Sequence, residues 1–408
     1  MLKKYVILFY ALLSSVGLFA QYEEWTTDSI TVDTASVQPS WEEQLQCRLT
    51  ALTQDALFET SQLGMMVYDL DADSALFVFN HRQAMRPAST MKVLTAVTAL
   101  DLLGGDYTFQ TRLCVDGDVE GRTLRGDVYC VGGLDPLFDD YDMQVFADSL
   151  KSLGIDTIRG SIYADNSMKN TDRYGAGWCW DDDEDNPVLI PLLYKGKDGF
   201  MDEFMKALRR GNIVFDAFAS ARTCPQSART VCIRSRGIDQ VLQPMMKNSS
   251  NLCAEALFYQ IAKYGGNSPA KASHAAKRVG ALIDRLGLDA SQYDVADGSG
   301  LSLYNYVSPE LEVRFLRHAW RNGPIFSLLY PSLPIAGVDG TLSKRMKNGN
   351  ASGNVHAKTG TVSRVSSLAG YLTASNGHTL CFSIINQGVT KVSMGRDFQD
   401  RVCEALSM

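Results

Sequence analysis

Three short strings, far apart in the sequence, carry side chains that could together perform acyl transfer. They are Ser89-Thr90-Met91-Lys92, Ser249-Ser250-Asn251 and Lys358-Thr359-Gly360. A serine hydroxyl is a good nucleophile only when a base within hydrogen-bond reach accepts its proton. Residues three apart share one face of a helix, so the amine of Lys92 can reach the hydroxyl of Ser89. Burial and a second cation such as Lys358 would lower the pKa of Lys92 and favour the uncharged base.

Each string alone is a weak signal, because two of them have a second match in the chain. Ser268-Pro269-Ala270-Lys271 repeats S-x-x-K, and we interpret Ser268 as a helix N-cap with Pro269 in the first helical position. Ser352-Gly353-Asn354 repeats S-x-N and is typical of a turn. The chosen set differs in its order and context, which are those of serine acyl-transfer enzymes, and we therefore predict catalysis for it.

The neighbouring segments predict the elements that position the three strings. The first string follows a hairpin and opens an apolar helix, so the free N–H of Ser89 could stabilise an oxyanion. The second string precedes a helix, and the third leads into a pair of strands. The predicted elements are a hairpin over 65–79, helices over 41–58, 89–103, 252–258 and 396–406, strands over 367–373 and 379–386, and a turn at Asn376-Gly377.

The N-terminus predicts secretion. Lys3-Lys4 precede an apolar run from Tyr5 to Ala20, and polar residues follow, which is the pattern of a cleaved signal peptide. The run is shorter than the roughly 18 apolar residues of a membrane span, and no later stretch reaches that length. We therefore expect no membrane segment after signal removal, although an uncleaved anchor stays open as the alternative.

Composition agrees with a secreted globular enzyme. The 408 residues are 45% hydrophobic, which is enough for a large core. A net charge of -7 without long basic blocks argues against nucleic acid and anionic lipid as partners. Among the 9 cysteines, pairing of Cys224 with Cys232 and of Cys114 with Cys130 is conceivable, and buried free thiols are an equal alternative. No Cys or His spacing suits zinc, so we predict no metal and no cofactor.

The middle of the chain predicts a separate lobe. Residues 106–244 contain short strands, glycine turns and one helix over 142–153. The acidic run in Trp178–Asp185 lacks the alternating ligands of a calcium loop, which favours a solvated loop over a metal site. The predicted organisation is a signal peptide over 1–20, a tether over 21–40, a catalytic domain over 41–105 and 245–408, and an inserted lobe over 106–244.

Further motifs around the three strings resemble one family, the class C low-molecular-mass penicillin-binding proteins of the penicillin-binding protein 4 type, or S13 D-Ala-D-Ala carboxypeptidases. The resemblance covers the chain from about residue 41 onward, and Ser250 departs from the Asp usual in the family. It implies an α/β (α+β) fold of the serine β-lactamase/transpeptidase type, an antiparallel sheet flanked by helices, with an inserted strand-rich lobe. The motifs are Pro87–Lys92, Asn248–Asn251 with Glu255, Asp297–Ser302, Gly337–Leu342, and Lys358–Thr361 with Ser366–Tyr371.

The resemblance implies catalytic roles for four side chains. Ser89 would attack the carbonyl between two D-alanines, and Lys92 would accept its proton. Ser249, between the two lysines, would relay this proton to the departing amine together with Lys358. No cofactor takes part.

The same resemblance implies substrate-binding roles for residues of the second and third strings. Asn251 would hold the amide on the acyl side of the substrate. Thr359 would bind the terminal carboxylate with Lys358, Gly360 would keep the strand edge open to the peptide, and the N–H of Thr361 would be the second oxyanion donor. Asp297–Leu301 and Gly337–Leu342 either shape the floor of the site or are simple glycine turns.

The implied function is that of a periplasmic serine-type D-alanyl-D-alanine carboxypeptidase, with endopeptidase action on cross-links also allowed. Its partners would be peptidoglycan stem peptides, and β-lactam antibiotics would be covalent inhibitors. Two alternatives stay open. A β-lactamase or esterase of the same fold would need fast deacylation, for which no extra carboxylate base is evident. A catalytically retired peptidoglycan-binding protein is disfavoured by the intact Ser89, Lys92, Ser249 and Lys358.

Overall fold

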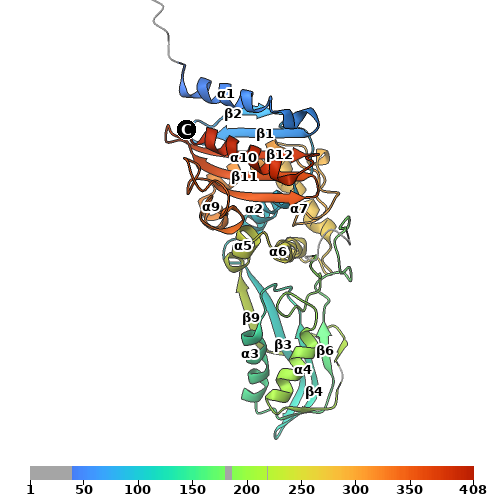
Figure 1. Cartoon of the computed structure of the whole chain (residues 1–408). Coiled ribbons are helices and arrows are strands. Elements are labelled where there is room, and N and C mark those ends of the chain that lie inside the picture. Colours follow the sequence, from blue (N-terminus) through green and yellow to red (C-terminus); the bar gives the residue numbers. More distant parts are fainter. Residues whose placement is uncertain (1–38, 180–185, 218) are drawn as a thin grey trace, which may run out of the picture. The chain divides into compact units, whose positions relative to one another are not determined.

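The predicted hairpin over 65–79 belongs to an antiparallel sheet whose other strands come from the C-terminal part of the chain (Figure 1). The computed structural model describes residues 39–179, 186–217 and 219–408, so the predicted signal peptide, nearly all of the tether and most of the acidic run lie outside them. Within the described residues the strand order is β10-β11-β12-β1-β2. The strands are β1 (Gln62–Asp69), β2 (Ser74–Phe79), β10 (His356–Val362), β11 (Val365–Thr373) and β12 (Thr379–Gln387).

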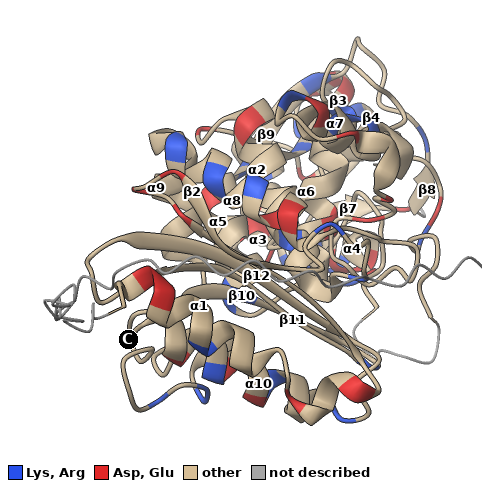
Figure 2. Ribbon diagram, turned by 90° about the horizontal axis from the view of Figure 1, so that it is seen from above, with Lys and Arg blue, Asp and Glu red and all other residues tan. Residues whose placement is uncertain are grey.

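Helices cover both faces of this sheet (Figure 2). α1 and α10 lie on one face, where Leu49 and Phe398 belong to one apolar core with Phe382 and Ile384 of β12. α2, α5, α6, α8 and α9 lie on the other face in a larger core, to which Ile385 of the same strand belongs. β11 and β12 are buried on both faces, and the polar residues that they bury include Ser366, Ser383 and Asn386. The helices are α1 (Trp41–Leu52), α2 (Met91–Leu103), α5 (Ile238–Lys247), α6 (Asn251–Lys263), α7 (Ala272–Arg285), α8 (Pro309–Arg321), α9 (Gly323–Ser332) and α10 (Val392–Leu406).

Several predicted helix boundaries need correction, and the helix predicted over 252–258 spans Asn251–Lys263. The first helix ends at Leu52 rather than 58, and a separate 3-10 turn, η1 (Ala56–Glu59), follows, with the Asp55 side chain accepting from the N–H of Leu57 at its start. The last helix begins at Val392, earlier than the predicted start at 396. The predicted turns at Asn376-Gly377 and at Ser352-Gly353-Asn354 are confirmed.

The interpretation of Ser268-Pro269 as a helix start was wrong. The N–H of Ala270 donates to the carbonyl of Met168 at 2.9 Å, and Ala270 pairs with Lys169 in a short β-bridge. This pairing keeps the chain extended, so α7 begins only at Ala272, with Lys271 as the N-cap. The second S-x-x-K string therefore does not lie along the start of a helix.

A second sheet is formed by β3 to β9, which follow β2 and precede β10 in the sequence (Figure 1). Its strand order is β7-β5-β4-β3-β9, with β6 paired to β4 and β8 paired to β6. α3 (Asp140–Ser152) and α4 (Phe200–Arg210) share its apolar core, which includes Phe146, Phe204 and Leu113. The strands are β3 (Thr108–Glu120), β4 (Thr123–Val131), β5 (Thr157–Ile158), β6 (Ile162–Asp165), β7 (Val214–Phe215), β8 (Ala219–Ala221) and β9 (Arg229–Gly237).

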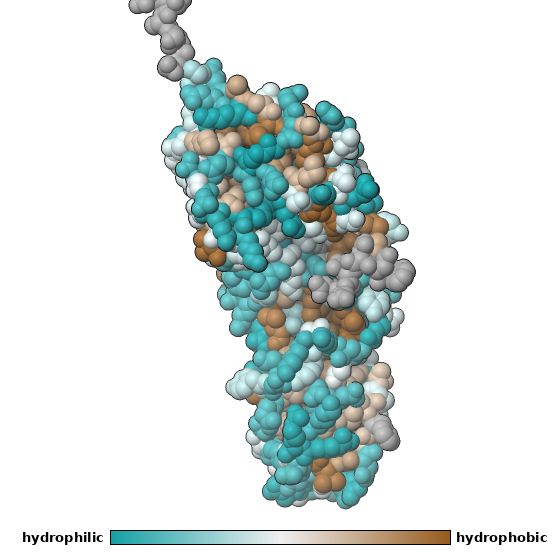
Figure 3. Space-filling model, viewed as in Figure 1, coloured by the Kyte–Doolittle hydropathy of each residue, from teal (hydrophilic) through white to brown (hydrophobic). Residues whose placement is uncertain are grey.

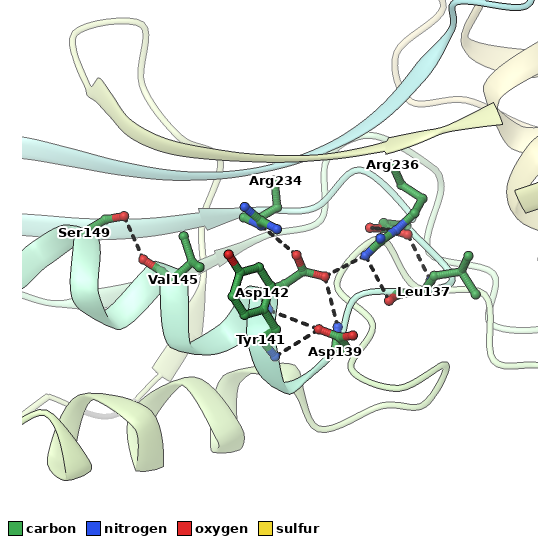
Figure 4. A network of polar contacts seen from close by, with 9 residues as sticks. Leu137, Asp139, Tyr141, Asp142, Val145, Ser149, Arg234 and Arg236 are labelled. Atoms are coloured by element: carbon green, nitrogen blue, oxygen red, sulfur yellow. Dashed lines mark hydrogen bonds and ion pairs between the residues drawn. The ribbon is translucent and has the colours of Figure 1, made fainter. Parts of the chain in front are cut away.

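A buried carboxylate joins α3 to β9 (Figure 4). One oxygen of Asp142 accepts from Nε of Arg234 at 2.6 Å, and the other accepts from Nη2 of Arg236 at 2.7 Å. The Asp142 side chain is only 3% exposed, whereas those of the two arginines are 26% and 19% exposed. Asp142 also accepts from the N–H of Asp139 in a capping box at the start of α3.

We expect Asp142→Asn to destabilise this sheet. The substitution leaves Arg234 without its anion and Arg236 with only Asp135, at 3.6 Å. Breaking a buried pair costs about 3 kcal/mol at the lower end of the usual range, and this value suits partners that are partly exposed. The free energy of unfolding in urea measures the loss. Asp216→Asn is the matched control, because Asp216 is 86% exposed and pairs with Arg159 at 3.4 Å, and it should cost less than about 0.5 kcal/mol. Equal stability of the two variants would contradict the prediction.

Neither predicted cysteine pair forms. In the β3–β4 register Leu113 rather than Cys114 lies opposite Cys130, and in the β3–β9 register Cys232 also lies opposite Leu113. Cys114, Cys130, Cys224 and Cys232 all carry free thiols. The alternative of buried free thiols holds for Cys114 and Cys130, which are both buried.

The face of the molecule in Figure 3 is mostly hydrophilic, with apolar residues in separate patches. Among the described residues, none of the helices has the length and apolar character needed to cross a membrane.

Candidate active site

Ser89 lies in a short 3-10 turn, η2 (Ala88–Thr90), directly before α2. The prediction placed Ser89 at the first position of the helix itself, but α2 begins at Met91. The turn is held on the sheet, because the hydroxyls of Thr90 and Ser367 both donate to the carbonyl of Pro87, at 2.8 and 2.5 Å. Ala88 has φ of +49°, a conformation that costs a non-glycine residue free energy and is often found at functional sites. Ser89 is half-buried, so its hydroxyl stays accessible.

Lys92 is fully buried and makes three short hydrogen bonds. Its Nζ donates to Oγ of Ser89 at 2.8 Å, to Oδ1 of Asn251 at 2.8 Å and to the carbonyl of Ser299 at 2.7 Å. The structure thus brings together the first and second strings. The contact with the Ser299 carbonyl was not predicted. Every residue has a backbone carbonyl, so no residue type in the sequence could mark this acceptor.

The second string lies in the connection between α5 and α6. Ser249 has φ of +59°, which is again a strained backbone conformation for a serine. Ser250 is the N-cap of α6 and accepts from the N–H of Cys253 at 3.3 Å. A serine fulfils this capping role as well as an aspartate does, which explains in physical terms how Ser250 can replace the usual Asp. Asn251 is the first residue of α6, and its side chain points to Lys92.

The third string is on β10, an edge strand of the first sheet. The side chain of Lys358 is fully buried, and its Nζ donates to Oγ of Ser249 at 2.8 Å and to the carbonyl of Thr359 at 2.7 Å. Burial, and then the nearby charge of Lys92, hold the pKa of Lys358 well below its usual value. The Thr359 hydroxyl donates to that of Thr341 at 2.8 Å, so one residue of the predicted floor segment 337–342 contacts the site directly.

Gly360 is where β10 comes closest to the nucleophile. A Cβ added to Gly360 would lie 2.0 Å from Oγ of Ser367, 2.7 Å from the carbonyl of Pro87 and 3.0 Å from the N of Ser89. Only glycine therefore fits between β10 and η2. Thr361 follows and is exposed, and its hydroxyl accepts from Nη2 of Arg396 at 3.1 Å.

Two cavities flank these residues. One of about 630 Å³ is lined by Ser249 and Asn251, and one of about 730 Å³ is lined by Thr361 and Arg86. Asn186 lines both cavities. Within the described ranges, no group of three or more His, Cys, Asp or Glu side chains is arranged to hold a metal ion.

Comparison with known proteins agrees with this geometry. The family model described as the D-Ala-D-Ala carboxypeptidase 3 (S13) family matches residues 45–191 and 194–407. The chain belongs to this family. The predicted resemblance to the S13 enzymes is thereby confirmed, and with it the classification of the chain as a serine-type hydrolase.

Individual relatives align with this S13 protein over most of its length. The D-alanyl-D-alanine carboxypeptidase of Actinomadura sp. (strain R39) is 26% identical over 442 residues, which cover 85% of this chain and 81% of the relative. The crystal structure of penicillin binding protein 4 (dacB) from Haemophilus influenzae matches with a TM-score of 0.80 at 23% identity, covering 88% of this chain and 98% of that one. The same protein complexed with a β-lactam matches with a TM-score of 0.74 at 23% identity, over 88% and 99%. These structures confirm the predicted fold class.

Proposed function

We propose that this S13 protein is a serine-type D-alanyl-D-alanine carboxypeptidase that acts on peptidoglycan stem peptides through an acyl-enzyme at Ser89. The observation that carries the proposal is the 2.8 Å hydrogen bond from Nζ of Lys92 to Oγ of Ser89. A buried amine in contact with a half-exposed serine hydroxyl is the arrangement that general-base activation needs. Membership of the S13 family supports the choice of D-Ala-D-Ala as the bond that is cleaved.

The acylation step would use both lysines. Lys92 accepts the proton of Ser89 as Oγ attacks the carbonyl carbon between the two D-alanines. The resulting oxyanion lies at the N–H groups of Ser89 and Thr361, where η2 and β10 meet. The bond to the terminal D-Ala then breaks, and its amine takes up the proton through the hydroxyl of Ser249. The contact of Ser249 with Lys358 at 2.8 Å supports this relay, and water later hydrolyses the acyl-enzyme.

Substrate binding would use the edge of β10. An extended peptide can add to an unpaired strand edge through main-chain hydrogen bonds. The terminal carboxylate would bind to Thr359 and to the buried ammonium of Lys358, while Asn251 would hold the amide on the acyl side. Residues beyond the cleaved bond would occupy the cavities beside Ser249 and Thr361.

Three further proposals concern partners, location and organisation. A β-lactam would acylate Ser89 in the same way, in line with the β-lactam complex of the Haemophilus relative. The N-terminal pattern and the cell-wall substrate support a periplasmic location. The two sheets support a catalytic domain over 41–105 and 245–408 with a lobe over 106–244.

Two measurements test the function. Labelled penicillin should form a stable adduct, and proteolysis with mass spectrometry should locate it on the peptide that contains Ser89. Purified muropeptides should lose one D-Ala, and splitting of cross-linked dimers would reveal endopeptidase action as well. A folded protein without an adduct at Ser89 would refute the proposal, and rapid turnover of the β-lactam without D-Ala release would identify a β-lactamase instead.

A further inference from the structure

Glu255 is a buried carboxyl group close to the site that the proposed mechanism does not use. It lies on α6, one turn after Asn251, and its residue exposure is 1%. Its Oε1 accepts from two consecutive backbone N–H groups, those of Gly298 at 3.1 Å and Ser299 at 2.8 Å. Two hydrogen bonds from neighbouring peptide groups to one oxygen fix the position of that stretch of backbone.

The stretch fixed by Glu255 is the one that contacts the base. The carbonyl of Ser299 accepts from Nζ of Lys92 at 2.7 Å. α6 thus holds Lys92 in two ways, directly through Asn251 and indirectly through Glu255 and the Ser299 peptide. A shift of the Gly298–Ser299 backbone would move one of the two acceptors, the Ser299 carbonyl and Oδ1 of Asn251, that aim Nζ at the hydroxyl of Ser89.

A second carboxylate holds the other end of the same loop. One oxygen of Asp297 accepts from the N–H of Gly300 at 2.8 Å, and the other accepts from the N–H of Ser302 at 2.7 Å and from Nε1 of Trp178 at 2.8 Å. Asp297 therefore fixes residues 300–302, whereas the Ser299 N–H donates to Glu255.

The electrostatic surroundings favour the neutral form of Glu255. Burial and then the charge of Asp297 raise the pKa of Glu255 to about 8, against the opposing effects of the Ser299 N–H and of Lys92. Burial and then the charge of Glu255 in turn raise the pKa of Tyr259, one turn further along α6. Below about pH 8 Glu255 therefore acts as a neutral acceptor, and above this pH it acquires a negative charge close to Lys92, which would favour the ammonium form of that lysine.

We propose that Glu255 is a positioning residue for the general base, which it aims at Ser89 by holding the Gly298–Ser299 peptide. This inference rests on the proposed function, since it assumes that Lys92 accepts the proton of Ser89. What the reaction requires of Glu255 is a hydrogen-bond acceptor at Oε1 and not a negative charge.

Two substitutions separate the acceptor from the charge. Glu255→Gln keeps an oxygen at the same place without a charge, and its rate of acylation by labelled penicillin at pH 7 should stay within about 3-fold of wild type. Glu255→Leu keeps a similar volume but removes the acceptor, and its rate should fall about 30-fold, because small misplacements of reacting groups cost up to about 100-fold. Gln260→Leu is the matched control, because it removes a buried amide of α6 that bonds Tyr107 and the Gly133 carbonyl. It should lose stability and keep its acylation rate.

The pH profile is the readout that a merely structural role would not change. Wild type and Glu255→Gln should acylate with a constant rate ratio below about pH 8, and above it wild type should become relatively slower. An acylation rate of Glu255→Leu equal to that of Gln260→Leu would overturn the inference, as would a Glu255→Gln variant as slow as Glu255→Leu. Failure of the wild-type protein to react with penicillin would instead refute the proposed function.

Discussion

Lys92→Met should lower the rate of acylation by penicillin about 10³-fold to 10⁴-fold, with a similar loss of D-Ala release. The substitution keeps an unbranched side chain in the buried space but removes the amine that contacts Oγ of Ser89 at 2.8 Å. General-base catalysis typically contributes up to about 10⁴-fold, and here no other described side chain is seen to bond Oγ of Ser89. The rate of adduct formation with labelled penicillin measures the effect, and Ser89→Ala supplies the blank.

Lys169→Met is the matched control for this experiment. Lys169 is also buried, with 3% exposure, and its Nζ donates to the carbonyl of Asn170 at 2.8 Å and lies 4.8 Å from the centre of the Tyr259 ring. Both variants lose a buried amine and its hydrogen bonds, so both should be less stable in urea, but Lys169→Met should acylate within a few-fold of wild type. If the two variants acylated at equal rates, Lys92 could not be the base.

Gly360→Ala should slow acylation about 10²-fold to 10³-fold. The new methyl group would lie 2.0 Å from Oγ of Ser367 and 3.0 Å from the N of Ser89, so β10 and η2 must move apart. This separation would displace one of the two N–H groups proposed to bind the oxyanion, and loss of one such donor costs 10²-fold to 10³-fold in rate. Single-turnover acylation rates measure the effect, and the dissociation constant of the initial penicillin complex should change less than the rate of bond formation.

Gly377→Ala separates this effect from a general loss of stability. Gly377 lies in the hairpin turn between β11 and β12 of the same sheet, with φ of +87° and open space around its Cα. An alanine there should cost about 1 kcal/mol through its left-handed backbone conformation and should leave acylation unchanged. A Gly360→Ala variant that reacted as fast as Gly377→Ala would remove β10 from the proposed oxyanion site.

The sequence predicted those parts of the site that depend on side chains at regular spacing. Ser89 and Lys92 could be paired because their separation of three residues is short and local. The pairing of Lys358 with Ser249 could be expected only from the full set of strings, since their contact spans distant parts of the chain. The hairpin over 65–79 and the turn at Asn376-Gly377 followed from local turn chemistry in the same way.

The features that were missed depend on the backbone or on tertiary contacts. The Ser299 carbonyl binds Lys92, but every residue type has a carbonyl, so no sequence signal could identify it. Ser268-Pro269 carries the composition of a helix start, yet pairing of Ala270 with Lys169 overrides this local preference. The segment 337–342 was expected either to shape the floor of the site or to be a simple glycine turn, and the contact of Thr341 with Thr359 decides for the floor.

The complete enclosure of the two site lysines has a practical consequence for handling the protein. Lys92 and Lys358 are both 0% exposed, whereas Lys344 and Lys391 are open to solvent. Amine-reactive resins and dyes couple to amines that the solvent reaches. Mild coupling would therefore attach the folded enzyme through surface lysines such as Lys344 and Lys391 and would leave Lys92 and Lys358 unmodified. Under denaturing conditions the same reagents would reach all lysines. After mild coupling, an immobilised enzyme that still captures penicillin would show that the fold survived attachment.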